Sequence, residues 1–134
     1  MRRRLSLWPC LFLASTCQAL KIRFGGKEYT IPLKANLKIS SIIEQAVEKI
    51  RDADSADLVQ ALPIGLPDLR LVRDGRTILR GNWCDPALLG DRCCNAAGKI
   101  AKAGDVGVLC DEASRTANFY QLKDSEELEL LYMM

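Results

Sequence analysis

The sequence predicts an α+β domain in which a mixed sheet packs against one helix. Apolar residues alternate with polar ones in Leu20–Phe24 and again in Glu28–Leu33, the period of strands with one buried face. Apolar side chains follow helical spacing within Ser41–Ile50. A mostly apolar run, Leu128–Tyr132, is typical of a central or well-covered strand. Strands on one side of a single helix favour a two-layer fold.

Short signals mark the boundaries of these first elements. Gly25-Gly26 separates the two alternating runs and is a dipeptide typical of a tight hairpin turn. Pro32 has no backbone N–H, so the second strand is expected to lie at an edge or to end there. Ser41-Ile42-Ile43-Glu44 matches the capping-box pattern, which predicts that Ser40 or Ser41 caps the helix.

A second hairpin is expected after Leu66-Pro67. The apolar residues of Leu69–Val72 lead into Asp74-Gly75, which is a signal for a type I′ turn. Thr77–Leu79 then returns as a short strand.

The first nineteen residues have the layout of a secretory signal peptide. Arg2–Arg4 precede the apolar run Leu5–Ala14, and Cys17-Gln18-Ala19 supplies small residues before a cut after Ala19. The apolar run is too short for a transmembrane helix, and no membrane span is expected in the mature chain. An organelle transit peptide or an uncleaved segment is the alternative. We therefore expect the secretory pathway or secretion, or an organelle after transit-peptide cleavage.

Composition argues against several functions. The 134 residues suit one domain, and none of them is histidine. This absence excludes Ser-His-Asp and Cys-His nucleophile systems and every zinc site that uses histidine. Three of the 19 basic residues lie in the leader, which leaves 16 basic and 17 acidic residues from Leu20 onward. Because a nucleic-acid binder keeps a basic surplus in its folded part, nucleic acid is not an expected partner.

Two longer segments resemble a known family. Ile64–Arg76 resembles the proline-containing loop of ubiquitin and the following strand, which ends in a glycine turn. Ser114–Leu131 is similar to the Arg-Thr, Tyr and final-strand run of ubiquitin. The hairpin with Gly26-Lys27 and the helix Ser41–Ile50 fall in the right order with these segments. The chain therefore resembles the ubiquitin-like superfamily.

This resemblance implies a domain organisation and a class of function. Residues 20–134 would form a ubiquitin-like β-grasp domain after a leader of residues 1–19, with a cysteine-containing insertion over about residues 80–113. A conjugated modifier needs a flexible tail that ends in Gly-Gly, whereas this sequence ends Leu131-Tyr132-Met133-Met134. The resemblance thus implies a non-conjugating, non-catalytic interaction module or adaptor that binds a protein partner and needs no cofactor or metal.

The resemblance also implies a contact surface. Val72 falls where ubiquitin has its central contact isoleucine, and Leu131 falls where ubiquitin has the neighbouring valine. Arg73 lies beside Val72, and Arg70 lies on the same strand. We therefore expect these four residues to bind the partner. The plainer interpretation is that Val72 and Leu131 are ordinary sheet residues.

A second family offers a weaker match. The N-terminal interaction domain of the apoptotic DNA-fragmentation proteins also has an Asp-Gly turn and a final acidic-to-apolar strand, and such domains pair through oppositely charged faces. The Arg115-Thr116 pair and the run Tyr120–Asp124 favour ubiquitin over that family.

The insertion holds four cysteines, Cys84, Cys93, Cys94 and Cys110. It is rich in glycine and is expected to be a loop with one short helix around Ala96–Ala103. In a secreted chain the cysteines would form two disulfides, with the adjacent pair bonded to Cys84 and Cys110 in either order. Free thiols, a four-thiolate zinc site and a redox thiol pair are the alternatives. The second hypothesis for function is a secreted, disulfide-stabilised binding domain that uses this insertion.

Overall fold

The computed structural model describes residues 18–54, 66–95 and 97–132 of the chain. Apart from its last two residues, the expected signal peptide lies outside the described residues. The described domain begins slightly before Leu20, because Ala19 already belongs to the first strand. The N–H of Ala19 donates to Oδ1 of Asp124 at 2.9 Å, and its carbonyl accepts from the N–H of Ser125 at 2.8 Å.

Five strands form a mixed sheet in the order β2-β1-β8-β3-β4. β1 and β8 run parallel, whereas the other neighbouring pairs are antiparallel. The expected central position of the last strand and edge position of the strand that contains Pro32 are therefore confirmed. The strands are β1 (Ala19–Phe24), β2 (Lys27–Pro32), β3 (Leu69–Arg73), β4 (Thr77–Ile78) and β8 (Glu127–Tyr132).

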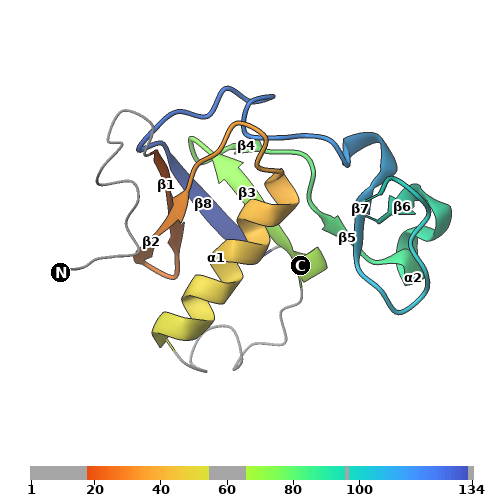
Figure 1. Ribbon diagram of the computed structural model, residues 1–134. Helices are drawn as coiled ribbons and strands as arrows, with labels where there is room; N and C mark the ends of the chain where they lie inside the picture. The colour runs from red at the N-terminus through yellow and green to blue at the C-terminus, as the bar shows by residue number, and fades with distance from the viewer. Residues whose placement is uncertain (1–17, 55–65, 96, 133–134) are drawn as a thin grey trace, which may run out of the picture.

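The helix α1 (Ile39–Asp54) lies across one face of this sheet (Figure 1). The main core lies between the two layers, and the expected α+β class with a mixed sheet is confirmed. No helix among the described residues is both long enough and apolar enough to span a bilayer. The fully buried large side chains of this core come from α1, from the sheet and from the segment after β4: Leu20, Ile22, Ile31, Ile39, Ile42, Ile43, Ile50, Leu71, Leu79, Leu128 and Leu130.

The start of α1 differs from the sequence prediction. The helix begins at Ile39, so Ser40 and Ser41 lie inside it and neither is the cap. The N–H of Ile39 donates to the carbonyl of Arg115 at 3.2 Å, and Lys38 forms an isolated bridge with Thr116. A segment distant in sequence thus accepts from the first N–H of the helix, which a local motif cannot reveal.

Both predicted hairpin turns are confirmed. β1 and β2 pair up to Phe24 and Lys27, so Gly25-Gly26 alone forms the loop, with φ of 61° and 82°. In the second hairpin, Asp74 and Gly75 have φ of 57° and 72°, and the N–H of Arg76 donates to the carbonyl of Arg73. Two successive residues with positive φ are the requirement of a type I′ turn.

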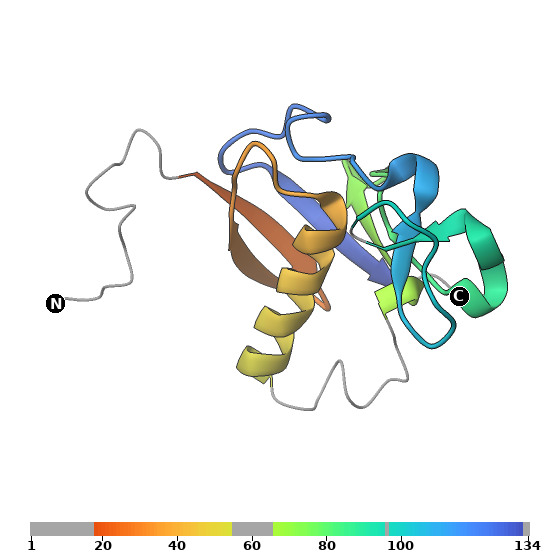
Figure 2. The same cartoon turned by 45° about the vertical axis from the view of Figure 1, so that its right-hand side comes forward.

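The insertion is an ordered unit and not a loop. Its three strands pair in the order β5-β7-β6. This small sheet lies beside the two layers formed by α1 and the five-stranded sheet (Figure 2). The expected helix around Ala96–Ala103 is wrong, because Asn95 Oδ1 accepts from the N–H groups of Ala97 and Lys99 and holds a turn there. The elements of the insertion are β5 (Trp83–Cys84), α2 (Pro86–Leu89), β6 (Cys93–Cys94) and β7 (Gly107–Leu109), with short 3₁₀ turns η3 (Gly90–Arg92) and η4 (Cys110–Glu112). A further 3₁₀ turn, η2 (Leu66–Asp68), lies outside the insertion and directly precedes β3.

Two disulfides cross-link the insertion. Cys84 bonds Cys93 with a Cα–Cα distance of 6.0 Å, and Cys94 bonds Cys110 with a Cα–Cα distance of 4.8 Å. Disulfide formation, with one of the two expected pairings, is thereby confirmed. The four sulfurs are bonded in two pairs, so the free-thiol and zinc alternatives do not describe this arrangement of the insertion.

Hydrogen bonds close the base of the insertion, and others join it to the rest of the domain. Glu112, only 3% exposed, accepts from Arg80 Nε at 2.5 Å and from the N–H of Gly81 at 3.0 Å. The indole N–H of Trp83 donates to the carbonyl of Ser40 on α1 at 2.9 Å, and the ring packs against the main core. Gly81 has a φ of 108°, and a Cβ there would lie 3.1 Å from Cβ of Ile39. Both ends of the insertion are therefore fixed at one place.

Replacing Gly107 with alanine should destabilise the insertion. A Cβ at this position would overlap the carbonyl of Cys94 and approach Sγ of Cys93 to 3.0 Å, so β7 could not keep its distance from β6. We expect a loss of about 1–3 kcal/mol in the free energy of unfolding, measured by denaturant titration of the oxidised protein. The control Ala103→Val, at an exposed position of the same insertion, should stay within about 0.5 kcal/mol of wild type. Equal effects of the two substitutions would contradict the predicted overlap.

Limited reduction should open the Cys94–Cys110 bond first. Cys110 is exposed, whereas Cys84 and Cys93 are 4% and 0% exposed, so a small thiol reaches only the former bond without local opening. Mass spectrometry after brief reduction and alkylation should find Cys94 and Cys110 labelled together. Full reduction in denaturant is the control and should label all four cysteines of the insertion. If Cys93 and Cys110 are the two cysteines labelled first, they are bonded to each other, and the pairing of Cys94 with Cys110 is wrong.

Candidate functional site

The sheet face opposite α1 is exposed and is chemically divided. Because side chains that face one another across paired strands point to the same side, the strand register assigns each residue to a face. On β1 and the adjoining half of β8, this outer face carries Lys21, Arg23, Glu127 and Glu129, and Arg23 lies 3.4 Å from Glu127 in an ion pair. Toward β3 and β4 the face becomes apolar.

Three of the four predicted binding residues meet on the apolar part of this face. Arg70 is paired with Leu131 across β3 and β8, and Val72 is the next residue of β3 on the same side. Arg70 and Leu131 are half-buried, whereas Val72 is only 3% exposed. A partner at this surface would therefore touch Leu131 and Arg70 and would reach Val72 only at its margin.

Ile78 belongs to the same surface, although the sequence prediction missed it. It pairs with Val72 across β3 and β4, and its side chain is 43% exposed. The only signal in the sequence was the type I′ turn at Asp74-Gly75, which sets the register of the two strands. We call Arg70, Val72, Ile78 and Leu131 the outer-face strip.

Arg73, the fourth predicted binding residue, lies on the opposite side of β3. Its Nε donates to Oε2 of Glu126 at 2.5 Å, and its Nη1 donates to the carbonyl of Tyr120 at 3.0 Å. Its neighbour across β8 is the core residue Leu128. The structure thus separates Arg73 from the outer-face strip and engages its guanidinium in contacts within the domain.

The carboxyl group of Glu126 is held in its charged form. Partial burial raises its pKa, but the hydrogen bonds from the Arg73 side chain and the Lys123 N–H, with the two nearby positive charges, lower it more. The net result is a pKa below the ordinary value of 4.5.

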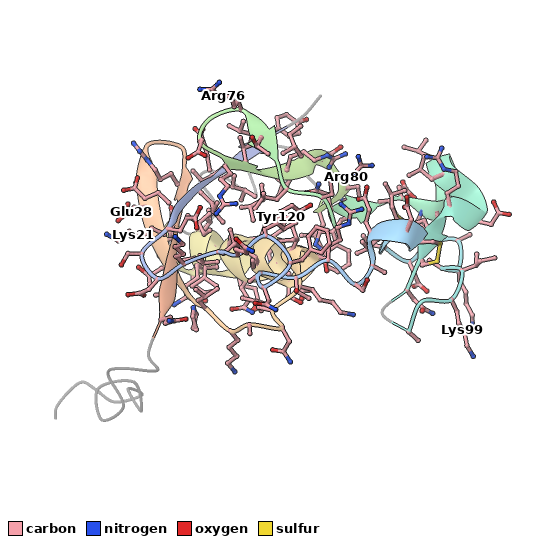
Figure 3. The ribbon with its side chains drawn as sticks, turned by 90° about the horizontal axis from the view of Figure 1, so that it is seen from above. Lys21, Glu28, Arg76, Arg80, Lys99 and Tyr120 are labelled. Carbon is pink, nitrogen blue, oxygen red and sulfur yellow. A yellow bond between two sulfur atoms is a disulfide. The ribbon has the colours of Figure 1, made fainter. Side chains whose placement is uncertain are left out.

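A groove of about 730 Å³ lies between the sheet and the insertion. Arg70 and Ile78 of the outer-face strip line one side, and Leu88 and Leu89 of α2 line the other. Figure 3 shows Arg80 at the junction between these two parts, whereas Lys99 lies at the far end of the insertion. The groove and the outer-face strip are therefore adjacent surfaces that share two residues.

Acid should weaken the domain in part through Glu126. A carboxyl group whose folded pKa is lowered stabilises the fold fully above its unfolded pKa, and this contribution disappears as the pH falls through the folded value. The variant Glu126→Gln should therefore lose less stability than wild type between about pH 6 and pH 3, as followed by thermal unfolding. The matched variant Glu127→Gln, which removes a surface carboxylate at the exposed ion pair, is the control for the loss of one acidic group. If the stability of wild type and of Glu126→Gln falls equally with decreasing pH, the lowered pKa assigned to Glu126 is contradicted.

The site residues are thus distributed over two adjoining surfaces, one on the sheet and one at the insertion. Comparison with models of known protein families and with curated protein sequences finds no match.

Proposed function

We propose that residues 20–134 form a ubiquitin-like β-grasp domain of the non-conjugating type, a non-catalytic module that binds a partner protein through the outer-face strip. The sequence resemblance and the arrangement of elements support the same fold. Hairpin, helix, hairpin and last strand follow in that order, with β1 parallel to β8 and α1 on one face. Binding at the sheet leaves the two-layer core untouched.

One observation carries the choice of surface. Ile78 and Leu131 stand exposed or half-buried around Val72, Arg70 borders them, and the neighbouring part of the face on β1 and β8 is charged. Apolar area next to arginine is the composition enriched at protein interfaces. The charged half of the face, with its own ion pair, would form the wet rim of such an interface.

The two disulfides also support the proposed compartment. They are compatible with an oxidising environment such as the secretory pathway, where such bonds persist. We therefore propose secretion or residence in the secretory pathway.

Substituting Leu131 with aspartate should abolish partner binding and leave the fold intact. The new carboxylate would lie opposite Arg70 across the strands, so an attractive pair offsets part of the cost within the free domain. A partner's apolar contact would instead meet a charge that must lose its water. Quantitative pull-down with oxidised bait, followed by mass spectrometry, should show partners that are lost with Leu131→Asp.

Two further baits complete this test. Ile78→Asp, on the same strip, should lose the same partners, whereas Thr30→Asp, exposed on the far strand β2, should retain them. Thermal unfolding checks that each bait is folded. If folded Leu131→Asp and Thr30→Asp capture the same proteins, the outer-face strip is not the binding surface.

A further inference from the structure

The two disulfides of the insertion differ in how closely solvent approaches them. Cys84 and Cys93 are 4% and 0% exposed, and both belong to the small core of the insertion. Cys110 is exposed, and its Sγ lies 3.5 Å from the carbonyl oxygen of Asp91, a residue that is exposed as well. Because disulfide exchange requires a thiolate to approach one of the bonded sulfurs, the Cys94–Cys110 bond is the accessible one of the two in the folded domain.

The segment between Cys94 and Cys110 has little core of its own. Its Ala101 packs in the small core of the insertion, whereas its Ile100 and Val106 are 59% and 41% exposed. Figure 3 shows Lys99, within this segment, at the far end of the insertion. The disulfide closes a loop of separation 16, so its loss removes a covalent constraint from a segment that packs weakly. Such segments open locally at a low cost in free energy.

A pocket of about 290 Å³ separates this segment from the start of α1. Cys94, Asn95 and Val106 line it on the side of the insertion, and Ser41 and Glu44 line it on the side of α1. The insertion is therefore not packed tightly against the helix here. The segment has free volume beside it into which it can shift after the bond opens.

The accessible disulfide lies next to the junction that closes the base of the insertion. Cys110 begins η4 and Glu112 ends it. Glu112 accepts from Arg80 and from the N–H of Gly81, so a loosened η4 would take this carboxylate away from both donors. The main core, by contrast, contains no described residue between 84 and 116. Opening the bond thus acts on the junction and leaves the two-layer core in place.

We propose that the Cys94–Cys110 disulfide is a redox switch, which oxidation closes and a dithiol reductant opens. A thiolate of the reductant attacks Sγ of Cys110, forms a mixed disulfide with it and releases the thiolate of Cys94, which takes up a proton. The second thiolate of the reductant then attacks the reductant's own sulfur in the mixed disulfide and releases Cys110. The protein disulfide has gained two electrons and two protons, and the reductant has become a disulfide.

The opened state differs from the closed state only in part of the molecule. The segment 95–109 and Glu112 are released, whereas the buried bond between Cys84 and Cys93 still holds the part of the insertion that contains α2. Leu109 and Glu112 line the groove, so the switch changes that surface. The outer-face strip lies on β3, β4 and β8 and keeps its geometry. The inference is therefore independent of the outer-face proposal and goes beyond it.

A redox titration tests whether the bond opens in the required range. The oxidised protein is equilibrated in glutathione buffers of stepped thiol-to-disulfide ratio, quenched with acid and alkylated, and mass spectrometry assigns each cysteine by its peptide. Cys94 and Cys110 should be reduced in the buffers that reduce half of an added protein disulfide isomerase, while Cys84 and Cys93 stay bonded. If Cys94–Cys110 opens only where Cys84–Cys93 opens too, the bond is a structural cross-link and the proposal is wrong.

Amide hydrogen exchange tests what the bond controls. When Cys94–Cys110 is reduced, exchange at Val108 of β7 and at Gly81, whose N–H donates to Glu112, should become at least about tenfold faster. Exchange at Leu130, which is 1% exposed in the main core, should remain at its oxidised rate. Unchanged exchange at Gly81 would show that the bond does not control the junction. Faster exchange at Leu130 as well would show that the bond supports the whole domain, and either result overturns the switch.

Paired serine variants separate this effect from a general loss of a disulfide. Cys94→Ser combined with Cys110→Ser should give fast exchange at Gly81 under oxidising conditions, because it reproduces the opened state. The matched control, Cys84→Ser combined with Cys93→Ser, removes the buried bond and should keep Gly81 protected. Equal exchange at Gly81 in the two double variants would contradict a switch located at Cys94–Cys110.

Discussion

The carboxylate of Glu112 accepts from Arg80 and Gly81 at the start of the insertion, although Glu112 itself lies at the end of the insertion. These bonds bring the two ends together, so the chain leaves and re-enters the main domain at one place. The buried charge is tolerated because both of its oxygens accept a hydrogen bond. The position of the groove depends on the same junction.

Local rules predicted the part of the fold that local chemistry controls. The two-residue period of β1 and β2, the glycines of the first turn and the Asp74-Gly75 turn all have their cause within a few residues. The helix start at Ile39 and the order within the insertion depend on partners far away in sequence. The insertion has only a small core of its own, so its sequence has no apolar pattern that predicts strands. The four cysteines were the only feature of its sequence that indicated how it is held together.

The residues of the candidate site also differ in whether the sequence could predict them. Arg70, Val72 and Leu131 were predicted by resemblance, and the register brings them to one face because each strand alternates sides. Arg73 is the neighbour of Val72 on β3, so the same alternation places it on the opposite face, where it contacts Glu126. Ile78 and Leu88 carried no motif at all. Their relevance comes from exposure of apolar surface, a property that depends on what the rest of the chain leaves uncovered.

The connectivity of the cysteines has a consequence for biosynthesis. Cys84 is bonded to Cys93, nine residues later in the sequence, and Cys94 is bonded to Cys110, 16 residues later. The two disulfide-closed loops therefore follow one another along the chain and do not overlap. In the secretory pathway proposed above, a chain that is oxidised as it emerges from a membrane channel would present Cys93 to Cys84 first and then Cys110 to Cys94. Vectorial entry would then make the native linkage the first one available, with little need for disulfide shuffling.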